Sequence, residues 1–160
     1  MIAVDICNTL ANVASELKKL GIEQDTYPSP LPESFFSSPK GLRVFRNAKP
    51  FEGAKYMIIQ LSKIYGGVTY VTTRPKEARP VTRRWLSENG FPSGKIIFCK
   101  WQEKPDIYTK LNPCIIIEDD PRVLDSIKDR KVLVLVPQWS YNNHINGKGI
   151  VPCGWKSNWH

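Results

Sequence analysis

Short apolar runs alternate along the chain with longer amphipathic stretches. The runs are bounded by turn or helix signals, which is typical of strands buried on both faces of a parallel sheet. Five runs of this kind occupy residues 2–5, 67–72, 95–99, 114–118 and 131–136. Strands that alternate with helices through right-handed crossovers predict an α/β domain built on an open, mainly parallel sheet.

Three of the stretches between these runs have helical periodicity: residues 52–64, 76–89 and 121–129. Their apolar positions fall on one helical face each. These positions are Ala54, Met57, Ile58, Leu61 and Ile64 in the first stretch, Val81, Trp85 and Leu86 in the second, and Val123, Leu124 and Ile127 in the third. Gly66 and Gly67 are expected to end the first helix, and Pro121 stands at a first-turn position of the third.

Two segments do not follow the alternation. Residues 22–50 are rich in Pro, Ser and aromatic residues and show no clear period, and they are too long for an ordinary connection in a compact α/β unit. We therefore expect a small cap or lid, inserted after the first strand–helix unit. The aromatic residues that favour burial over a disordered linker are Tyr27, Phe35, Phe36 and Phe45. Residues 137–160 are expected to form an irregular tail, in which Trp139, Tyr141 and Asn142 either pack on the sheet edge or line a pocket mouth.

Length and composition set the frame for these elements. A chain of 160 residues fits one domain, residues 1–160. No apolar run approaches the ~20 residues needed to cross a bilayer, and no secretory signal is recognisable, so a cytoplasmic protein without a membrane partner is expected. The four cysteines, Cys7, Cys99, Cys114 and Cys153, are widely spaced. Neither a disulfide framework nor a zinc site with His144 or His160 is predicted.

The net charge of +8 favours anionic partners, among which nucleotides, phosphosugars and nucleic acid all qualify. The basic residues are spread along the chain without a block of five or six. The sequence therefore does not decide whether these residues form a solvated basic surface or a functional one.

Polar residues gather at the ends of the predicted strands, where ligands bind in open parallel sheets. They are Asp5, Cys7, Asn8 and Thr9 after the first strand, Thr72, Thr73 and Arg74 at the end of the second, Glu118, Asp119 and Asp120 at the end of the fourth, and Lys104 before that strand. Carboxylates from separate loops suit a hard cation such as Mg²⁺, which shares its oxygen ligands with phosphate. Lysine and threonine neutralise or hydrogen-bond phosphoryl oxygens.

This arrangement resembles the haloacid dehalogenase (HAD) superfamily over roughly residues 2–137. The first motif of that family is an apolar strand followed by DxDx(T/V), and Asp5, Cys7 and Thr9 occupy it in order. The second is a strand that ends in Ser or Thr, here in YVTTRP, and the fourth is an acidic pair after a strand, here in IIIEDDP. The third motif is a Lys, for which Lys104 has the best spacing. The cap position and the tail VPQWSYNN resemble small 5'(3')-deoxyribonucleotidase-type 5'-nucleotidases, which implies a Rossmann-like three-layer fold.

The resemblance also implies a role for each residue. Asp5 would be the nucleophile that forms an aspartyl-phosphate. The backbone carbonyl of Cys7 and the carboxylate of Asp119 would complete the Mg²⁺ ligands, with Asp120 or Glu118 holding the ion indirectly or replacing Asp119. Thr72 would bind the phosphoryl group, and Lys104 would balance charge between that group and Asp5. Thr9, Thr73 and Arg74 are further candidates for substrate binding.

Each of these residues also has a plain structural interpretation. Asp5 could cap the first helix, Thr72 could be an ordinary β-branched strand residue, and Lys104 could be a solvated surface lysine. Arg74 is open between contact with a phosphate and exposure to solvent.

Cys7 departs from the family pattern, because phosphatases of this kind usually place a second Asp there to protonate the leaving oxygen and then activate water. A thiol of pKa ~8.5 is a poor match for that transfer, and the loss of general acid–base help costs ~10²–10⁴-fold. The chain could be a slow enzyme, could use another acid or a better leaving group, or could have lost turnover.

Two main hypotheses follow. The first is a magnesium-dependent hydrolase of a small phosphorylated substrate, with a nucleotide among the candidates. The alternative is a catalytically impaired module that binds phosphate or nucleic acid on the same fold. A receiver domain of the response-regulator type fits poorly, because the chain lacks an acidic pair after the first strand and carries the long insert.

Overall fold

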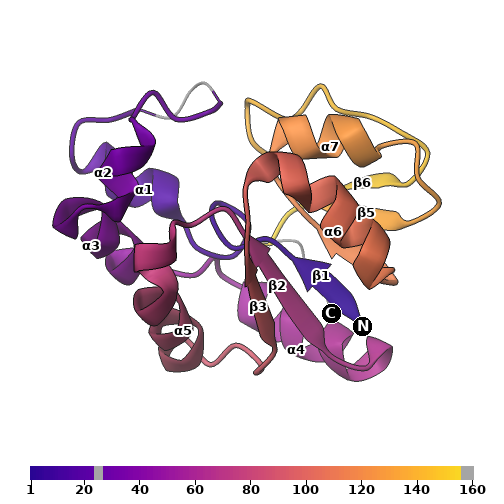
Figure 1. Ribbon diagram of the computed structural model, residues 1–160. Helices are drawn as coiled ribbons and strands as arrows, with labels where there is room; N and C mark the ends of the chain where they lie inside the picture. The colour runs from indigo at the N-terminus through magenta and orange to yellow at the C-terminus, as the bar shows by residue number, and fades with distance from the viewer. Residues whose placement is uncertain (24–26, 156–160) are drawn as a thin grey trace.

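Six parallel strands form one sheet in the order β3-β2-β1-β4-β5-β6 in the computed structural model, which describes residues 1–23 and 27–155 (Figure 1). The strands are β1 (Ile2–Val4), β2 (Val68–Thr72), β3 (Lys95–Phe98), β4 (Ile115–Ile117), β5 (Leu133–Pro137) and β6 (Ile150–Cys153). The central strand β1 pairs Ile2 with Val68 on one side and with Ile115 on the other. The strand order reverses between β1 and β4, as in a doubly wound Rossmann-like sheet, so the predicted fold class is confirmed.

Helices cover both faces of this sheet. They are α1 (Val13–Lys18), α2 (Glu33–Ser37), α3 (Pro39–Asn47), α4 (Ala54–Tyr65), α5 (Arg79–Glu88), α6 (Lys104–Leu111) and α7 (Pro121–Ile127), with short 3-10 turns η1 (Lys76–Ala78) and η2 (Trp101–Glu103) before α5 and α6. In the part of the chain that the structure describes, no helix has the length and apolar character needed to cross a membrane.

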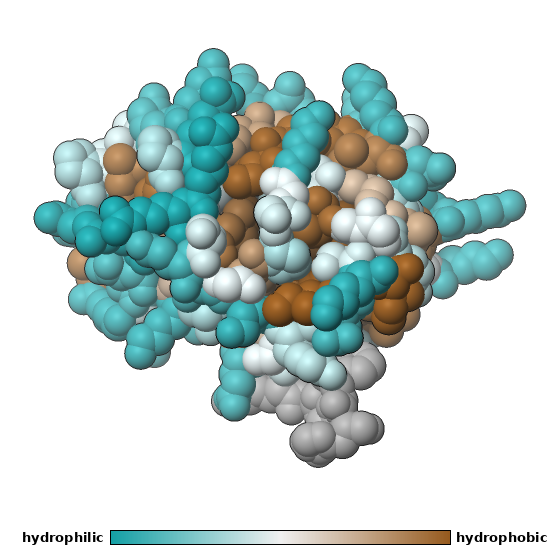
Figure 2. Space-filling view, turned by 90° about the horizontal axis from the view of Figure 1, so that it is seen from below, coloured by the Kyte–Doolittle hydropathy of each residue, from teal (hydrophilic) through white to brown (hydrophobic). Residues whose placement is uncertain are grey.

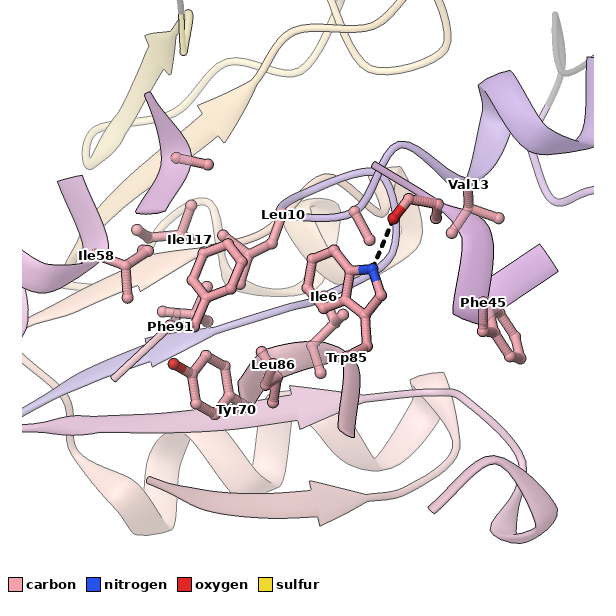
Figure 3. Packing of buried hydrophobic residues seen from close by; sticks show 14 of the residues in the cluster. Ile6, Leu10, Val13, Phe45, Ile58, Tyr70, Trp85, Leu86, Phe91 and Ile117 are labelled. Atoms are coloured by element: carbon pink, nitrogen blue, oxygen red, sulfur yellow. Dashed lines mark hydrogen bonds between the residues drawn. The ribbon is translucent and has the colours of Figure 1, made fainter. Parts of the chain in front are cut away.

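Alternate strand residues pack into two cores, one on each face. Ile2 and Val4 of β1 and Ile117 of β4 contact the larger core, which α3, α4 and α5 cover. Figure 3 shows Trp85 within this core, where its indole N–H donates to the carbonyl oxygen of Ala48 at 2.6 Å. Residues from α6 and α7 form the second core on the opposite face. Because both faces are covered, the strands read as continuous apolar runs.

The five strands expected from the sequence are confirmed to within two residues at each end. The prediction for the face of α4 was wrong at one position, because Ile64 is 70% exposed while Ser62 is buried. Ser62 lies one turn after Ile58. Its buried hydroxyl has a hydrogen-bond partner, because it donates to the carbonyl oxygen of Ile59 at 2.9 Å.

Both segments without a clear period contain regular structure. The stretch 22–50 includes α2 and α3, and the tail includes β6, so the expectation of an irregular tail was wrong there. These elements are short, and Pro39 and Pro152 lie within them, which weakened the periodic signal. Phe45 is buried and stacks on Phe36 at 5.8 Å between ring centroids. Trp159 and His160 lie outside the described residues.

Candidate active site

The predicted site residues meet where β1 and β4 end side by side. Asp5 directly follows β1, and its backbone N–H donates to the carbonyl oxygen of Ile117 in β4 at 2.9 Å. Glu118 directly follows β4. This is the point at which the strand order reverses, and ligands of open α/β sheets bind there. The alternative that Asp5 caps the first helix is wrong, because Asn12 caps α1.

Lys104 joins the two strand ends from the first position of α6. Its Nζ lies 2.6 Å from Asp5 Oδ1 and 2.8 Å from Glu118 Oε2, and its side chain is 1% exposed. It is therefore not a surface lysine. Burial disfavours the charged amine, but the carboxylates of Asp5 and Glu118 outweigh that cost and hold the pKa of Lys104 well above its ordinary value.

Three carboxylates cluster at the strand ends, and the ammonium group of Lys104 contacts two of them, Asp5 and Glu118. Oxygen atoms of Asp5, Glu118 and Asp119 lie within 4.8 Å of one another, and all three residues are buried. Burial, together with the nearby charges of Asp5 and Glu118, raises the pKa of Asp119 well above its usual range. Burial also raises the pKa of Glu118, although Lys104 partly offsets the effect. The group therefore carries an excess of buried negative charge, and its oxygen donors are those that Mg²⁺ prefers.

Asp119 is held in place by hydroxyl groups from two other segments. Thr9 Oγ1 donates to Asp119 Oδ1 at 2.8 Å, and Tyr141 Oη donates to Oδ2 at 2.6 Å. Neutral donors of this kind orient a carboxylate without cancelling its charge. Thr9, predicted as a substrate-binding residue, thus contacts a carboxylate of the site.

Asp120 points away from this group. Its carboxylate accepts the backbone N–H of Arg122 at 2.9 Å and caps α7, and Arg122 Nη2 lies 2.8 Å from its Oδ2. Tyr27 Oη donates to the same Oδ2 at 3.1 Å. The sequence left open which acidic residue at this strand end accompanies Asp5. In the structure, Glu118 and Asp119 lie close to Asp5. Asp120 instead caps α7 and accepts a hydrogen bond from Tyr27 of the insert.

Arg74 is buried beneath position 7 and is not exposed to solvent. Its Nε–H donates to Cys7 Sγ at 3.1 Å, and its guanidinium carbon lies 4.4 Å from the centroid of the Phe45 ring. Its Nη1 donates to Thr82 Oγ1 at 3.2 Å. Burial raises the pKa of the Cys7 thiol, and the neighbouring Arg74 only partly counters it. Cys7 is therefore a neutral thiol near neutral pH.

The two threonines of β2 and its continuation face different surroundings. Thr72 is fully buried, and its Oγ1 accepts the backbone N–H of Arg74 at 3.3 Å. Thr73 is exposed. Thr72 is thus in the strand-end position that the second motif predicts, whereas Thr73 is accessible from solvent.

Aromatic residues at the rim of the site hold its loops together. Trp139 Nε1 donates to the carbonyl oxygen of Asn8 at 2.9 Å, and the Trp139 and Tyr141 rings stack at 5.7 Å. The Tyr27 ring of the insert lies 4.9 Å from that of Tyr141. From the sequence, Trp139 and Tyr141 could either pack on the sheet edge or line a pocket mouth. The two alternatives could not be separated, because Asn8 and Trp139 are 131 residues apart in sequence and their contact is not evident from it.

The chain is similar in sequence to proteins named as putative nucleotidases. No family model matches the chain. A Bacillus cereus protein named "Putative nucleotidase" is 30% identical over 105 residues, which are 64% of this chain and 56% of that protein. An Oceanobacillus iheyensis protein that is also named as a putative nucleotidase is 30% identical over 103 residues, which are 62% of this chain and 55% of that protein. The chain thus spans about half the length of the curated relatives it matches.

Proposed function

We propose that the chain is a magnesium-dependent phosphohydrolase that acts on a small phosphomonoester, such as a nucleotide, through an aspartyl-phosphate at Asp5. The observation that carries this proposal is the buried contact of Asp5 with Lys104 beside Glu118 and Asp119, at the strand ends where the order of the sheet reverses. The resemblance to HAD-type phosphatases and the similarity to proteins named as nucleotidases support it.

In the first step, a carboxylate oxygen of Asp5 attacks phosphorus and the alcohol leaves. Lys104 supplies a fixed positive charge beside that carboxylate, which offsets charge on the phosphoryl oxygens as the bond breaks. The carboxylates of Asp5, Glu118 and Asp119 fit Mg²⁺, which when bound would neutralise phosphoryl charge. The resemblance adds the backbone carbonyl of Cys7 to this set. Thr72, at the end of β2, would hydrogen-bond the phosphoryl group.

The second step transfers the phosphoryl group from Asp5 to water, and both steps need a proton relay. The neutral Cys7 thiol is poorly suited to give a proton to an alkoxide or to take one from water. Turnover is therefore expected to be slow, and fastest with leaving groups that need no protonation. The same substitution keeps the alternative open that the site binds phosphate without turnover.

Phosphate release should require Mg²⁺ and should respond to pH in a defined direction. Because burial raises the pKa of Glu118 to about 7 and that of Asp119 well above its usual range, protons compete with the cation for these carboxylates around neutral pH. The Mg²⁺ concentration that gives half-maximal rate should therefore rise as the pH falls from about 8 to about 6. The measurement is phosphate release from nucleoside monophosphates and an aryl phosphate, with excess EDTA as control. Full activity in EDTA would contradict the metal requirement.

Replacing Cys7 by aspartate should raise turnover of nucleotides by on the order of 10²-fold or more, because it supplies the missing acid–base group. The gain should be smaller on an activated aryl phosphate, whose leaving group needs no proton. Arg74 Nε would donate to the new carboxylate and favour its ionised form, so the gain should be larger when Arg74 is also changed to glutamine. Cys114→Asp, at an exposed cysteine, is the matched control. An absence of turnover in both wild type and Cys7→Asp would favour the binding module.

A further inference from the structure

More than half of the net positive charge of the chain lies on α3, on α5 and on the residues beside them, which are far apart in sequence. Residues 33–49 and 76–88 contain eight Lys or Arg and three Glu, and so carry a net charge of +5 of the chain's +8. The eight cations are Lys40, Arg43, Arg46, Lys49, Lys76, Arg79, Arg83 and Arg84. All eight are exposed. A basic block that the linear sequence does not show is thus built by folding.

The elements that carry these cations are neighbours in space, because α3 packs against both η1 and α5. Figure 1 shows α3 and α5 together at the left of the sheet, and the face seen in Figure 2 is strongly hydrophilic on that side. Lys40, Arg43 and Arg46 follow one another at intervals of three, so they line one face of α3. Among the described residues, Arg84 is the one of the eight with an ion-pair partner, Glu88. We call these eight residues the basic surface.

The basic surface borders the candidate active site at both of its inner ends. The backbone N–H of Asn12, in the loop after Asp5, donates to the carbonyl oxygen of Lys49 at 2.9 Å. At the other end, Lys76 follows the exposed Thr73 by three residues, just beyond the carboxyl end of β2. A ligand that lies across α3 and α5 is therefore held by positive charge up to the border of the site, where Lys104 is the cation beside Asp5.

We propose that the basic surface binds a single strand of nucleic acid and directs its terminal phosphate to Asp5, an extension that rests on the proposed function. A lone nucleotide carries one phosphate group, whereas α3 alone extends about 13 Å and presents a row of cations. A polymer of regularly spaced phosphates matches that row. Half-buried Phe35 and Phe36 on α2, next to α3, offer ring surface for base stacking, as in other single-strand sites.

Because the site is buried, a flexible end of a single strand is the form of nucleic acid that can reach it. Asp5 is 3% exposed and Lys104 1% exposed, so the reacting phosphorus must enter beyond the strand ends. Internal phosphodiesters and the broad end of a duplex cannot protrude that far, but a terminal phosphomonoester on a single strand can.

The test is fluorescence anisotropy of a labelled single strand of about 20 nucleotides carrying a 5'-phosphate, titrated with the whole chain at several salt concentrations. The variant is Arg43→Gln with Arg46→Gln on α3. The control is Lys110→Gln with Lys131→Gln, which removes the same charge at exposed positions outside the basic surface. Each phosphate contact contributes about 0.7 to the slope of log affinity against log salt, so the α3 variant should lose about 1.4 and the control nothing.

Phosphate release from the same strand and from nucleoside monophosphates is measured in parallel. The proposal predicts that the α3 variant loses rate on the strand and keeps its rate on monophosphates. Equal loss of binding in the control variant, or equal competition by anionic phospholipid vesicles, would show a general charge effect and overturn it. Turnover of monophosphates without strand binding would also overturn it and would leave the proposed function standing. Strand binding without turnover of any substrate would uphold the binding surface and overturn the hydrolytic function.

Discussion

Asp5→Asn should abolish phosphate release, lowering kcat by at least on the order of 10³-fold on every substrate that the wild type hydrolyses. Asparagine has nearly the shape of aspartate and still accepts a hydrogen bond from Lys104, but its amide oxygen is a poor nucleophile. The variant should nevertheless fold as well as the wild type, because it removes one charge from a group in which three buried carboxylates share one ammonium. The measurements are steady-state phosphate release and a urea unfolding curve.

Asp106→Asn is the matched control, since Asp106 is exposed in the first turn of α6 and carries the same functional group. It should leave kcat unchanged. Retention of more than about a tenth of wild-type activity in Asp5→Asn would rule out a covalent intermediate on this residue. A lost fold with lost activity would instead assign Asp5 a structural role.

Lys104→Met should lower the free energy of unfolding by about 3–5 kcal/mol, measured by urea denaturation in the presence of EDTA. The methionine fills much of the same volume but leaves Asp5 and Glu118 buried without their positive partner. EDTA is needed because a bound divalent cation would replace the missing charge. Lys110→Met on the same helix removes an exposed lysine and should cost far less.

A second change distinguishes the loss of charge balance from a packing defect at this position. Lys104→Met combined with Glu118→Gln should recover part of the lost stability, because it removes one of the two stranded carboxylates. If Lys104→Met alone costs less than about 1 kcal/mol, the ammonium group behaves like a surface pair and does not balance the site.

The sheet could be predicted from the sequence because each of its first five strands is a continuous apolar run. Ile115–Ile117 reads as a strand in isolation, since all three residues are buried between two helical layers. β6 has no such signal: it is an edge strand with Pro152 inside it and two exposed residues. The helices of the insert were missed for a related reason, because α2 is too short to show a period and its two phenylalanines are only partly buried.

The site could be predicted only in part. Strand ends pointed to Asp5 and to the acidic residues 118–120, because topology alone brings the ends of β1 and β4 together. Lys104 was predicted from its spacing as the third motif of the resemblance. Sequence position could not separate Asp119 from its neighbours, since the direction of each side chain depends on the turn into α7. Nor could it show that Arg74 turns toward Cys7, because that contact depends on how α3 and α5 pack around the guanidinium.

The pairing of β1 with β4 has a consequence for how the chain is made. Asp5 meets Lys104 across 99 residues, and Asn8 meets Trp139 across 131. Contacts between residues so distant in sequence form slowly. During translation, the edge of β1 that pairs with β4 therefore stays unpaired until most of the chain has left the ribosome. An apolar strand with an open edge is a template for association with other nascent chains. We therefore expect the soluble yield to depend on how soon β4 follows β1 during synthesis, as well as on the stability of the finished fold.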